Sequence, residues 1–485
     1  MVENLKQRTF KAFAWDLSGK LADQGLGFFI SILLARLLAP EEFGLLAMAA
    51  VIISLSQVLI DSGLGTALIQ RQEVRDDHYG SVFFFNIVVG SLLTVIFFFA
   101  AGKVAGFYER PELKPIVRAL SFSFIINSFA RVQSAWLSKQ LKLKVITQAR
   151  IIALVISGTL GVSLAILNYG VWALVLQSLV GAGISSLYIS LSAGWRPRLV
   201  FSWIALKELW GFGFRVFISG LINTITSQLD RLIIGKIFSA ETLGYYQRSK
   251  SLNDFVVKYT SGSLMPVLFP ALSSVQHDRE RYNAIVLRSF HILSFVAFFI
   301  VGFLFLAAED VVVLLFTAKW LPSVIYFKIL ILSGFVYPYS ALLVNILTSK
   351  GNSKAFLKQT LLKEVLVILN LIVGFSFGLL EYLYGFTLVY YLALIINIQF
   401  AAKEMKINSG IFYRIIIQYI AITAFISSLY YLLIFLIPET GPFLSLLLVF
   451  IFFSVAYFVI SVLFKLEGFL LLKKEVFELF NKRSQ

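Results

Sequence analysis

Apolar stretches of roughly twenty residues recur along the chain, separated by short polar or proline-containing breaks such as those at Pro40 and Pro322. An α-helix of about 20 residues spans the hydrocarbon core of a bilayer. Inside lipid, backbone polar groups must be paired within the chain, so we expect these stretches to be helices. The expected helices are residues 12–38, 44–66, 81–102, 116–136, 148–168, 170–192, 212–235, 242–265, 284–307, 324–348, 358–380, 382–402, 412–436 and 443–464. The pattern predicts an all-α integral membrane protein with about 14 transmembrane helices.

The low charge content supports this prediction. Only 14% of the 485 residues are charged and 59% are hydrophobic, whereas soluble proteins carry roughly 25% charged residues. In a soluble protein, the formal net charge of +16 would suggest nucleic-acid binding. In a membrane protein, the same excess is typical of Lys and Arg gathered in cytoplasmic loops. We therefore expect membrane lipids, and no nucleic acid, as partners.

The residue types present favour neither a metal site nor a catalytic site. The chain has no cysteine, which excludes disulfides and thiolate chemistry. Its histidines, His78, His277 and His291, show no metal-ligand spacing, so we predict no metal, catalytic group or cofactor. The basic N-terminus precedes an apolar stretch that contains Asp16, runs past residue 38 and offers no small-residue cleavage site. It is expected to be a retained first helix.

Basic residues in alternate loops predict the orientation. By the positive-inside rule the loops rich in Lys and Arg face the cytoplasm, which places both termini there. The outer side carries one exception, a group of four cations beside Glu109 and Glu112, and half of them are expected to pair with these carboxylates. The four are Lys103, Arg110, Lys114 and Arg118.

An internal repeat predicts two lobes. Residues 36–44 read RLLAPEEFG, and residues 236–244, 200 positions later, read KIFSAETLG. Both segments join a first expected helix to a second, and an offset of six helices keeps the two copies parallel. We therefore expect an N-terminal lobe over 1–200 and a C-terminal lobe over 201–410, facing a central cavity. Residues 411–485 would add helices thirteen and fourteen and a cytoplasmic tail.

Three segments carry a family resemblance. They are Phe43–Arg71 (FGLLAMAAVIISLSQVLIDSGLGTALIQR), Leu229–Tyr246 (LDRLIIGKIFSAETLGYY) and Leu264–Asp278 (LMPVLFPALSSVQHD). The chain resembles Wzx-type, WzxC-like polysaccharide and lipopolysaccharide exporters of the multidrug/oligosaccharidyl-lipid/polysaccharide flippase superfamily.

The resemblance implies two six-helix lobes, an extra helix pair and a place in the cell inner membrane. It also implies transport of undecaprenyl-diphosphate-linked oligosaccharide, such as an O-antigen, capsule or exopolysaccharide unit. Polysaccharide polymerase and chain-length proteins are further partners that it suggests.

Charged and amide side chains lie inside several expected helices at helical spacing. A charge in lipid is costly, so such residues are expected to face a cavity or a partner. A net-positive cavity would suit a diphosphate, because Arg and Lys bind phosphate oxygens, and amides bind sugar hydroxyls. The predicted substrate-binding residues are Lys20, Arg131, Arg215, Arg231, Arg248, Lys250, Lys258, Asn127, Asn223 and Gln247. The alternative is structural pairing, as at Asp16 with Lys20 or Asp254 with Lys258.

Energy coupling has its own candidates. No ATPase motif is present, so an ion gradient or substrate mass action must drive transport, with H⁺ or Na⁺ as the possible coupling ion. Buried carboxylates can couple to protons by titrating as access alternates. The candidates are Asp16, Asp23, Asp230 and Asp254.

Two further motifs favour structural interpretations. Gly63 and Gly65, with no strand before them, are not a phosphate loop and are expected to end the second helix in a tight turn, which Asp61 would cap or orient. The basic cluster of Arg279, Arg281, Arg288, His277 and His291 is typical of positive-inside topology, with a diphosphate waiting site as the alternative.

Two other function classes were compared with the flippase. A multidrug antiporter of the same superfamily is the alternative, although a net-positive cavity disfavours its often cationic substrates. A membrane enzyme is rejected, because no Ser-His-Asp set, metal cluster or large extramembrane loop is visible.

Overall fold

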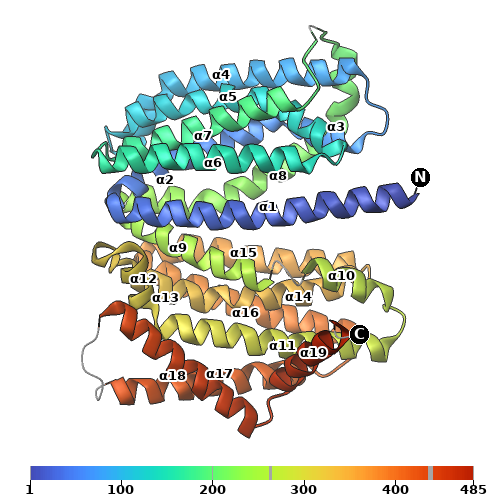
Figure 1. Ribbon diagram of the computed structural model, residues 1–485, viewed down its shortest axis with the longest axis vertical. Helices are drawn as coiled ribbons and strands as arrows, with labels where there is room; N and C mark the ends of the chain where they lie inside the picture. Colours follow the sequence, from blue (N-terminus) through green and yellow to red (C-terminus); the bar gives the residue numbers. More distant parts are fainter. Residues whose placement is uncertain (1, 199, 262–264, 435–440, 484–485) are drawn as a thin grey trace. The chain divides into compact units, whose positions relative to one another are not determined.

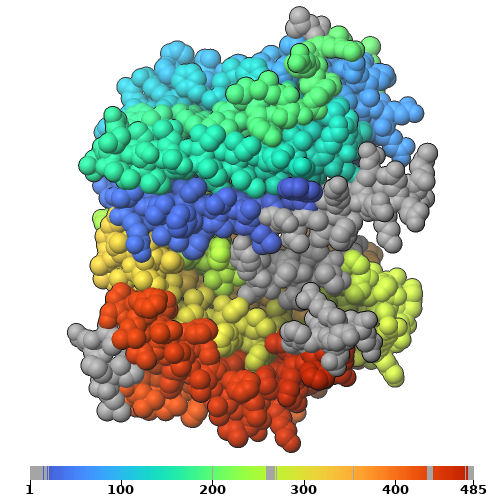
Figure 2. All heavy atoms as spheres, in the orientation of Figure 1, coloured from blue at the N-terminus to red at the C-terminus, as the bar shows by residue number. Residues whose placement is uncertain are grey.

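The computed structural model describes residues 2–198, 200–261, 265–434 and 441–483. Within these ranges the chain forms helices joined by short connections, and no strand (Figure 1). It divides into two compact units, Met1–Gln247 and Arg248–Gln485. On the face that Figure 2 shows, side chains cover the helices of each unit.

The first unit contains eight helices and the start of a ninth, within the described ranges. They are α1 (Val2–Leu37), α2 (Pro40–Asp61), α3 (Leu64–Gln70), α4 (Asp76–Tyr108), α5 (Leu113–Lys139), α6 (Leu143–Ile166), α7 (Val171–Ser192), α8 (Trp203–Ile237) and the start of α9 (Ala240–Ser261). Helix α1 packs on α6, α4 on α5, and α6 on α7. Helix α8 packs on α2, α3 and α4.

The second unit continues from α9. Its helices are α10 (Met265–Ser274), α11 (Arg279–Leu306), α12 (Ala308–Phe316), the 3-10 turn η1 (Ala318–Trp320), α13 (Ser323–Gly334), α14 (Val336–Ser349), α15 (Ser353–Phe377), α16 (Leu379–Met405), α17 (Gly410–Ile434), α18 (Pro442–Leu463) and α19 (Glu467–Arg483). Helix α11 contacts α13, α14, α17, α18 and α19, and α15 packs on α16 and α14.

Within the described residues, each of the fourteen apolar stretches expected from the sequence falls on helical segments; 44–66 runs from α2 into α3, and 324–348 is divided between α13 and α14. In the described part of the chain, ten helical segments are long and apolar enough to cross a membrane. Helices α1, α5, α8 and α9 are not among the ten. These are the helices that hold the charged stripes. The all-α membrane class is confirmed, and the count of fourteen crossings stays a prediction.

The two repeat segments touch each other inside the first unit. A Cβ atom on Gly44 would overlap the carbonyl oxygen of Ala240, and a Cβ on Gly244 would overlap that of Pro40. Gly44 and Gly244 are equivalent positions of the 200-residue repeat. The first turns of α2 and α9 therefore pack backbone to backbone, in a reciprocal way.

The compact units divide at Gln247, whereas the sequence placed a lobe boundary near residue 200. A buried cluster explains why α8 belongs to the first unit: Leu206 and Leu209 of α8 pack with Leu64 of α3, Val82 of α4 and Val132 of α5. The two six-helix lobes stay a prediction.

Candidate functional site

A polar cavity of about 390 Å³ lies in the first unit between α2, α5 and α8. Helix α2 presents one face to it, since its lining residues are spaced three, four and seven positions apart. Helix α8 contributes the polar side chains of Thr224, Ser227 and Gln228, together with apolar Val216 and Phe217. The lining residues are Ser54, Gln57, Val58, Asp61, Gly63, Arg131, Val216, Phe217, Gly220, Thr224, Ser227 and Gln228.

Arg131 supplies a cation to this cavity. Its Nε atom is buried and has no hydrogen-bond partner among the described residues. Asp61 lines the same cavity, and no ion pair within 4.0 Å joins the two in the described part of the chain. A guanidinium with unused donors can bind an anion bidentately. Of the predicted site residues, Arg131 lines this cavity, and its role in binding stays a prediction.

Asp61 lines the cavity from the last turn of α2, on the same helix face as Ser54 and Gln57. Helix α2 ends there, and Ser62 and Gly63 have left-handed φ angles of 45° and 68°. The prediction that the glycine run ends the second helix in a tight turn is confirmed. Sequence reasoning assigned Asp61 to this turn and missed its place in the cavity. The sequence did contain a signal for this position: Ser54, Gln57 and Asp61 are polar residues on one face of a mostly apolar helix.

Other predicted residues of the first unit lie around α8. The Nη1 atom of Arg231 donates to Oε1 of Gln228 at 2.9 Å, which links Arg231 to the cavity wall. Asp230 is buried; its carboxylate accepts from the Tyr246 hydroxyl at 2.5 Å and from the Arg231 amide at 2.8 Å. Arg215 is exposed on α8 and does not line this cavity.

Four more predicted residues of this unit also lie outside the cavity lining. Asn127 is half-buried on α5, one turn before Arg131, and Asn223 is exposed on α8. Asp23 is half-buried on α1. Gln247 is half-buried, and its Oε1 is buried without a hydrogen-bond partner among the described residues.

In the second unit, Arg248 is buried, with its guanidinium carbon 5.1 Å from the Phe316 ring centre and 5.4 Å from that of Trp320. Lys250 is half-buried and Asp254 is exposed. The side chains of Asp16, Lys20 and Lys258 lie outside the described residues, and so do the pairs predicted for them.

The basic cluster predicted near residue 280 is engaged with other groups. Arg279 donates to the Lys406 carbonyl at 2.6 Å. Arg288 pairs with Glu475 at 3.0 Å, and His291 with Glu467 at 3.0 Å. These contacts favour the structural interpretation over a diphosphate waiting site.

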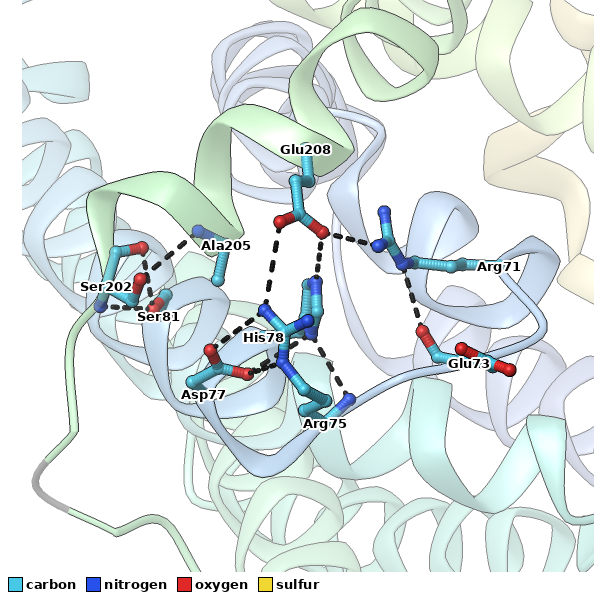
Figure 3. A network of polar contacts seen from close by, with 9 residues as sticks. All are labelled: Arg71, Glu73, Arg75, Asp77, His78, Ser81, Ser202, Ala205 and Glu208. Carbon is cyan, nitrogen blue, oxygen red and sulfur yellow. Dashed lines mark hydrogen bonds and ion pairs between the residues drawn. The ribbon is translucent and has the colours of Figure 1, made fainter.

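A second polar network joins the start of α4 to the start of α8 (Figure 3). Nδ1 of His78 accepts from the Arg75 amide at 3.2 Å, which leaves Nε2 to donate to Glu208 at 3.1 Å. Arg71 also pairs with Glu208, and Ser81 bonds the backbone of Ser202. The hydrogen bond from His78, with the charges of Arg71 and Arg75, lowers the pKa of Glu208.

The outer cations pair differently from the prediction. Arg110 pairs with Glu41 at 2.9 Å, and Glu109 pairs with Lys236 at 2.7 Å, which lowers the pKa of Glu109. The expected pairing of the outer cations with Glu109 and Glu112 is therefore wrong for Arg110. The chain reverses after Tyr108, which brings these side chains to the start of α2 and the end of α8. The partners Glu41 and Lys236 are distant in the sequence, so these pairs could not be predicted from neighbouring residues.

A family model described as polysaccharide biosynthesis protein matches residues 33–325 of the chain. The chain belongs to this family. The matched region includes the whole cavity and both repeat segments.

Curated proteins with similar sequences are named for the biosynthesis of cell-surface polysaccharides. The lipopolysaccharide biosynthesis protein WzxC of Escherichia coli (strain K12) is 23% identical over 403 residues, 81% of this chain and 80% of the relative. The teichuronic acid biosynthesis protein TuaB of Bacillus subtilis (strain 168) is 28% identical over 284 residues, 58% of each chain. The predicted membership among polysaccharide exporters is confirmed.

A solved structure shows the same fold. The lipid II flippase MurJ, in an inward closed conformation, superposes with a TM-score of 0.73 at 14% identity. The match covers 93% of this chain and 98% of the other. At this identity the likeness shows the fold alone.

Proposed function

We propose that the protein is a flippase that exports undecaprenyl-diphosphate-linked oligosaccharide across the inner membrane by alternating access. Family membership supports this, as do relatives named for polysaccharide biosynthesis or transport, among them the succinoglycan biosynthesis transport protein ExoT of Rhizobium meliloti (strain 1021). A diphosphate cannot cross hydrocarbon unaided, because desolvating its charge is prohibitive. The protein supplies a polar path while the polyprenyl tail stays in lipid, and no reaction is assigned to it.

The observation that carries the proposal is Arg131 in the polar cavity of the first unit. Its side chain lines the cavity, so an incoming phosphate oxygen would bind the guanidinium, and a small movement of the side chain would bring Nε, which has no hydrogen-bond partner within the described residues, into reach. Gln57, Thr224 and Gln228 line the same cavity and offer groups that bind sugar hydroxyls. Asp61 adds a carboxylate that weakens anion binding, which favours release over a tight clamp.

The other predicted residues complete the proposal. Distributed cations release a diphosphate more easily than one strong site does. They are Lys20, Arg215, Arg231, Arg248, Lys250 and Lys258, with Asn127, Asn223 and Gln247 as sugar contacts. Asp16, Asp23, Asp230 and Asp254 remain the proposed coupling groups for H⁺ or Na⁺.

The test replaces Arg131 by Ala and measures surface polysaccharide together with protein level. We expect export to fall at least tenfold at an unchanged protein level, since a charge-assisted hydrogen bond contributes about 1.5–3 kcal/mol. The matched control is Arg150→Ala, which removes an exposed arginine from α6. The mechanism would be contradicted if single Ala variants at Arg131 and at each of the six other cations all exported polysaccharide at the wild-type level.

Asp61 supports one alternative, a multidrug antiporter, because a carboxylate in a membrane cavity also suits a cationic compound. Asp61→Asn separates the two functions. A flippase keeps its anion site in this variant, whereas an antiporter loses drug efflux. Efflux of a cationic dye by wild-type protein that is abolished in Asp61→Asn, together with polysaccharide export that does not change when the protein is deleted, would favour the antiporter.

A further inference from the structure

Helix α19 is held against the second unit by one of its faces. Glu467 pairs with His291 at 3.0 Å, and Glu475, two turns later, pairs with Arg288 at 3.0 Å. Between them, a Cβ on Gly468 would overlap the His291 carbonyl oxygen and lie 2.6 Å from the Tyr419 hydroxyl. These contacts fix both the position and the rotation of α19 on α11.

The contacts also set the depth of α19. Arg288 and His291 lie about 6 and 10 Å inside the crossing predicted to begin at residue 284, at about 1.5 Å per residue. Only residues 464–466 separate α19 from the end of α18, where Leu463 and Phe464 are 72% and 71% exposed. Helix α19 is therefore placed at the level of the membrane interface, and not out in the cytoplasm.

The opposite face of α19 is apolar and flanked by lysines. Leu470 and Phe477, seven positions apart and thus on one face, are 46% and 66% exposed. Lys473 and Lys474 lie three and four positions after Leu470, and both are exposed. Among the described residues neither lysine has an ion-pair partner.

We propose that α19 is an interfacial helix whose outer face binds anionic phospholipid of the inner leaflet. Leu470 and Phe477 enter the acyl region, and Lys473 and Lys474 meet the lipid phosphates. Apolar side chains beside lysines, at a depth of about 5–10 Å, are typical of helices that lie in the interface. An anionic lipid is the occupant because its phosphate supplies negative charge beside two exposed lysines that make no ion pair among the described residues.

The first test is a depth measurement on the full-length protein in phosphatidylglycerol nanodiscs. The chain has no cysteine, so a nitroxide can be attached at Leu470→Cys or Phe477→Cys alone. We expect these labels to collide with oxygen more than with a water-soluble nickel complex, and a label at exposed Glu478→Cys to show the reverse. Equal nickel access at Phe477 and Glu478 overturns the proposal in favour of a solvated helix. Protection of Phe477 from both reagents overturns it in favour of a protein partner.

The second test concerns the lipid charge. Wild-type protein is expected to unfold at a higher temperature in phosphatidylglycerol than in phosphatidylcholine nanodiscs, and Lys473→Gln/Lys474→Gln should lose most of that difference. The control Lys354→Gln/Lys358→Gln removes two exposed lysines from α15. If the control lost the same share of this temperature difference, the effect would depend only on the net charge of the protein, and the proposal would be overturned.

Discussion

Gly63 combines two demands that only glycine meets. Its φ of 68° is in the left-handed region, and its Cα faces α8 so closely that a Cβ would overlap the Gly213 carbonyl oxygen. Gly63→Ala should cost about 1–2 kcal/mol for the left-handed backbone and about 1–3 kcal/mol for overpacking. We expect a lower unfolding temperature in detergent and, because Asp61 precedes this turn, weaker export.

The matched control for this prediction is Gly211→Ala. A Cβ on this exposed residue of α8 would meet nothing within 4 Å. Alanine favours a helix over glycine by about 1 kcal/mol, so the control should be neutral or stabilising. Equal destabilisation by both changes would show that the Gly63 contact does not matter.

Glu208 gives a pH-dependent prediction. Its ordinary pKa is 4.5, and the hydrogen bond from His78 lowers it in the folded protein. A depressed carboxyl pKa stabilises the fold above the unfolded value and stops doing so as pH falls through the folded value. Wild type should therefore unfold at a higher temperature than Glu208→Gln at pH near 7, and this advantage should shrink below pH 4.5.

The control is Glu73→Gln, which neutralises an exposed carboxylate in the loop before α4. It should change the unfolding temperature little at any pH. A constant gap between wild type and Glu208→Gln from pH 7 to well below pH 4.5 would mean that packing, and not charge, holds α8 to the start of α4.

At the scale of helices, the contact between the starts of α2 and α9 depends on two glycines. Gly44→Val must separate the two backbones, because its Cβ would overlap the Ala240 carbonyl oxygen. The pairs Arg110–Glu41 and Glu109–Lys236 join neighbouring residues at the same end. We expect Gly44→Val and Gly244→Val each to widen the distance between these helix ends and to reduce export.

Spin labels at Leu37→Cys and Ile237→Cys can measure this distance, since both side chains are exposed and equivalent in the repeat. Gly106→Val is the control, because a Cβ on Gly106 would meet nothing within 4 Å. An unchanged distance distribution in Gly44→Val would contradict the packing described for these helices.

Helices were more predictable than contacts. The apolar stretches are long, and lipid leaves the backbone few alternatives, so within the described residues each expected stretch lies on helical segments, while the number of crossings stays a prediction. Short α3, α10 and α12 escaped prediction because seven to ten residues carry too little periodic signal. Arg131 was found because a charge in an apolar helix stands out. Asp61 was missed as a cavity residue, because it ends α2 and its cavity neighbours come from α5 and α8.

At the scale of the whole molecule, orientation rests on the distribution of charge. The predicted cytoplasmic location of both termini gathers Lys and Arg on one side, and with it the proposed interfacial helix α19 would have Lys473 and Lys474 beside the inner leaflet. Anionic lipid holds basic segments there by about 1 kcal/mol per residue. This difference in positive charge between the two sides would oppose insertion in the opposite orientation. Both termini can be cytoplasmic only if the number of crossings is even.

Reporter fusions test this orientation. Green fluorescent protein fused after Gln485 should fluoresce, and alkaline phosphatase fused there should be inactive, since the first folds in the cytoplasm and the second needs the oxidising periplasm. Alkaline phosphatase fused after Tyr169, in the short connection from α6 to α7, is the positive control and should be active. An active phosphatase after Gln485 would require an odd number of crossings or the reverse orientation. Either outcome would move α19 and its lysines to the other face of the membrane.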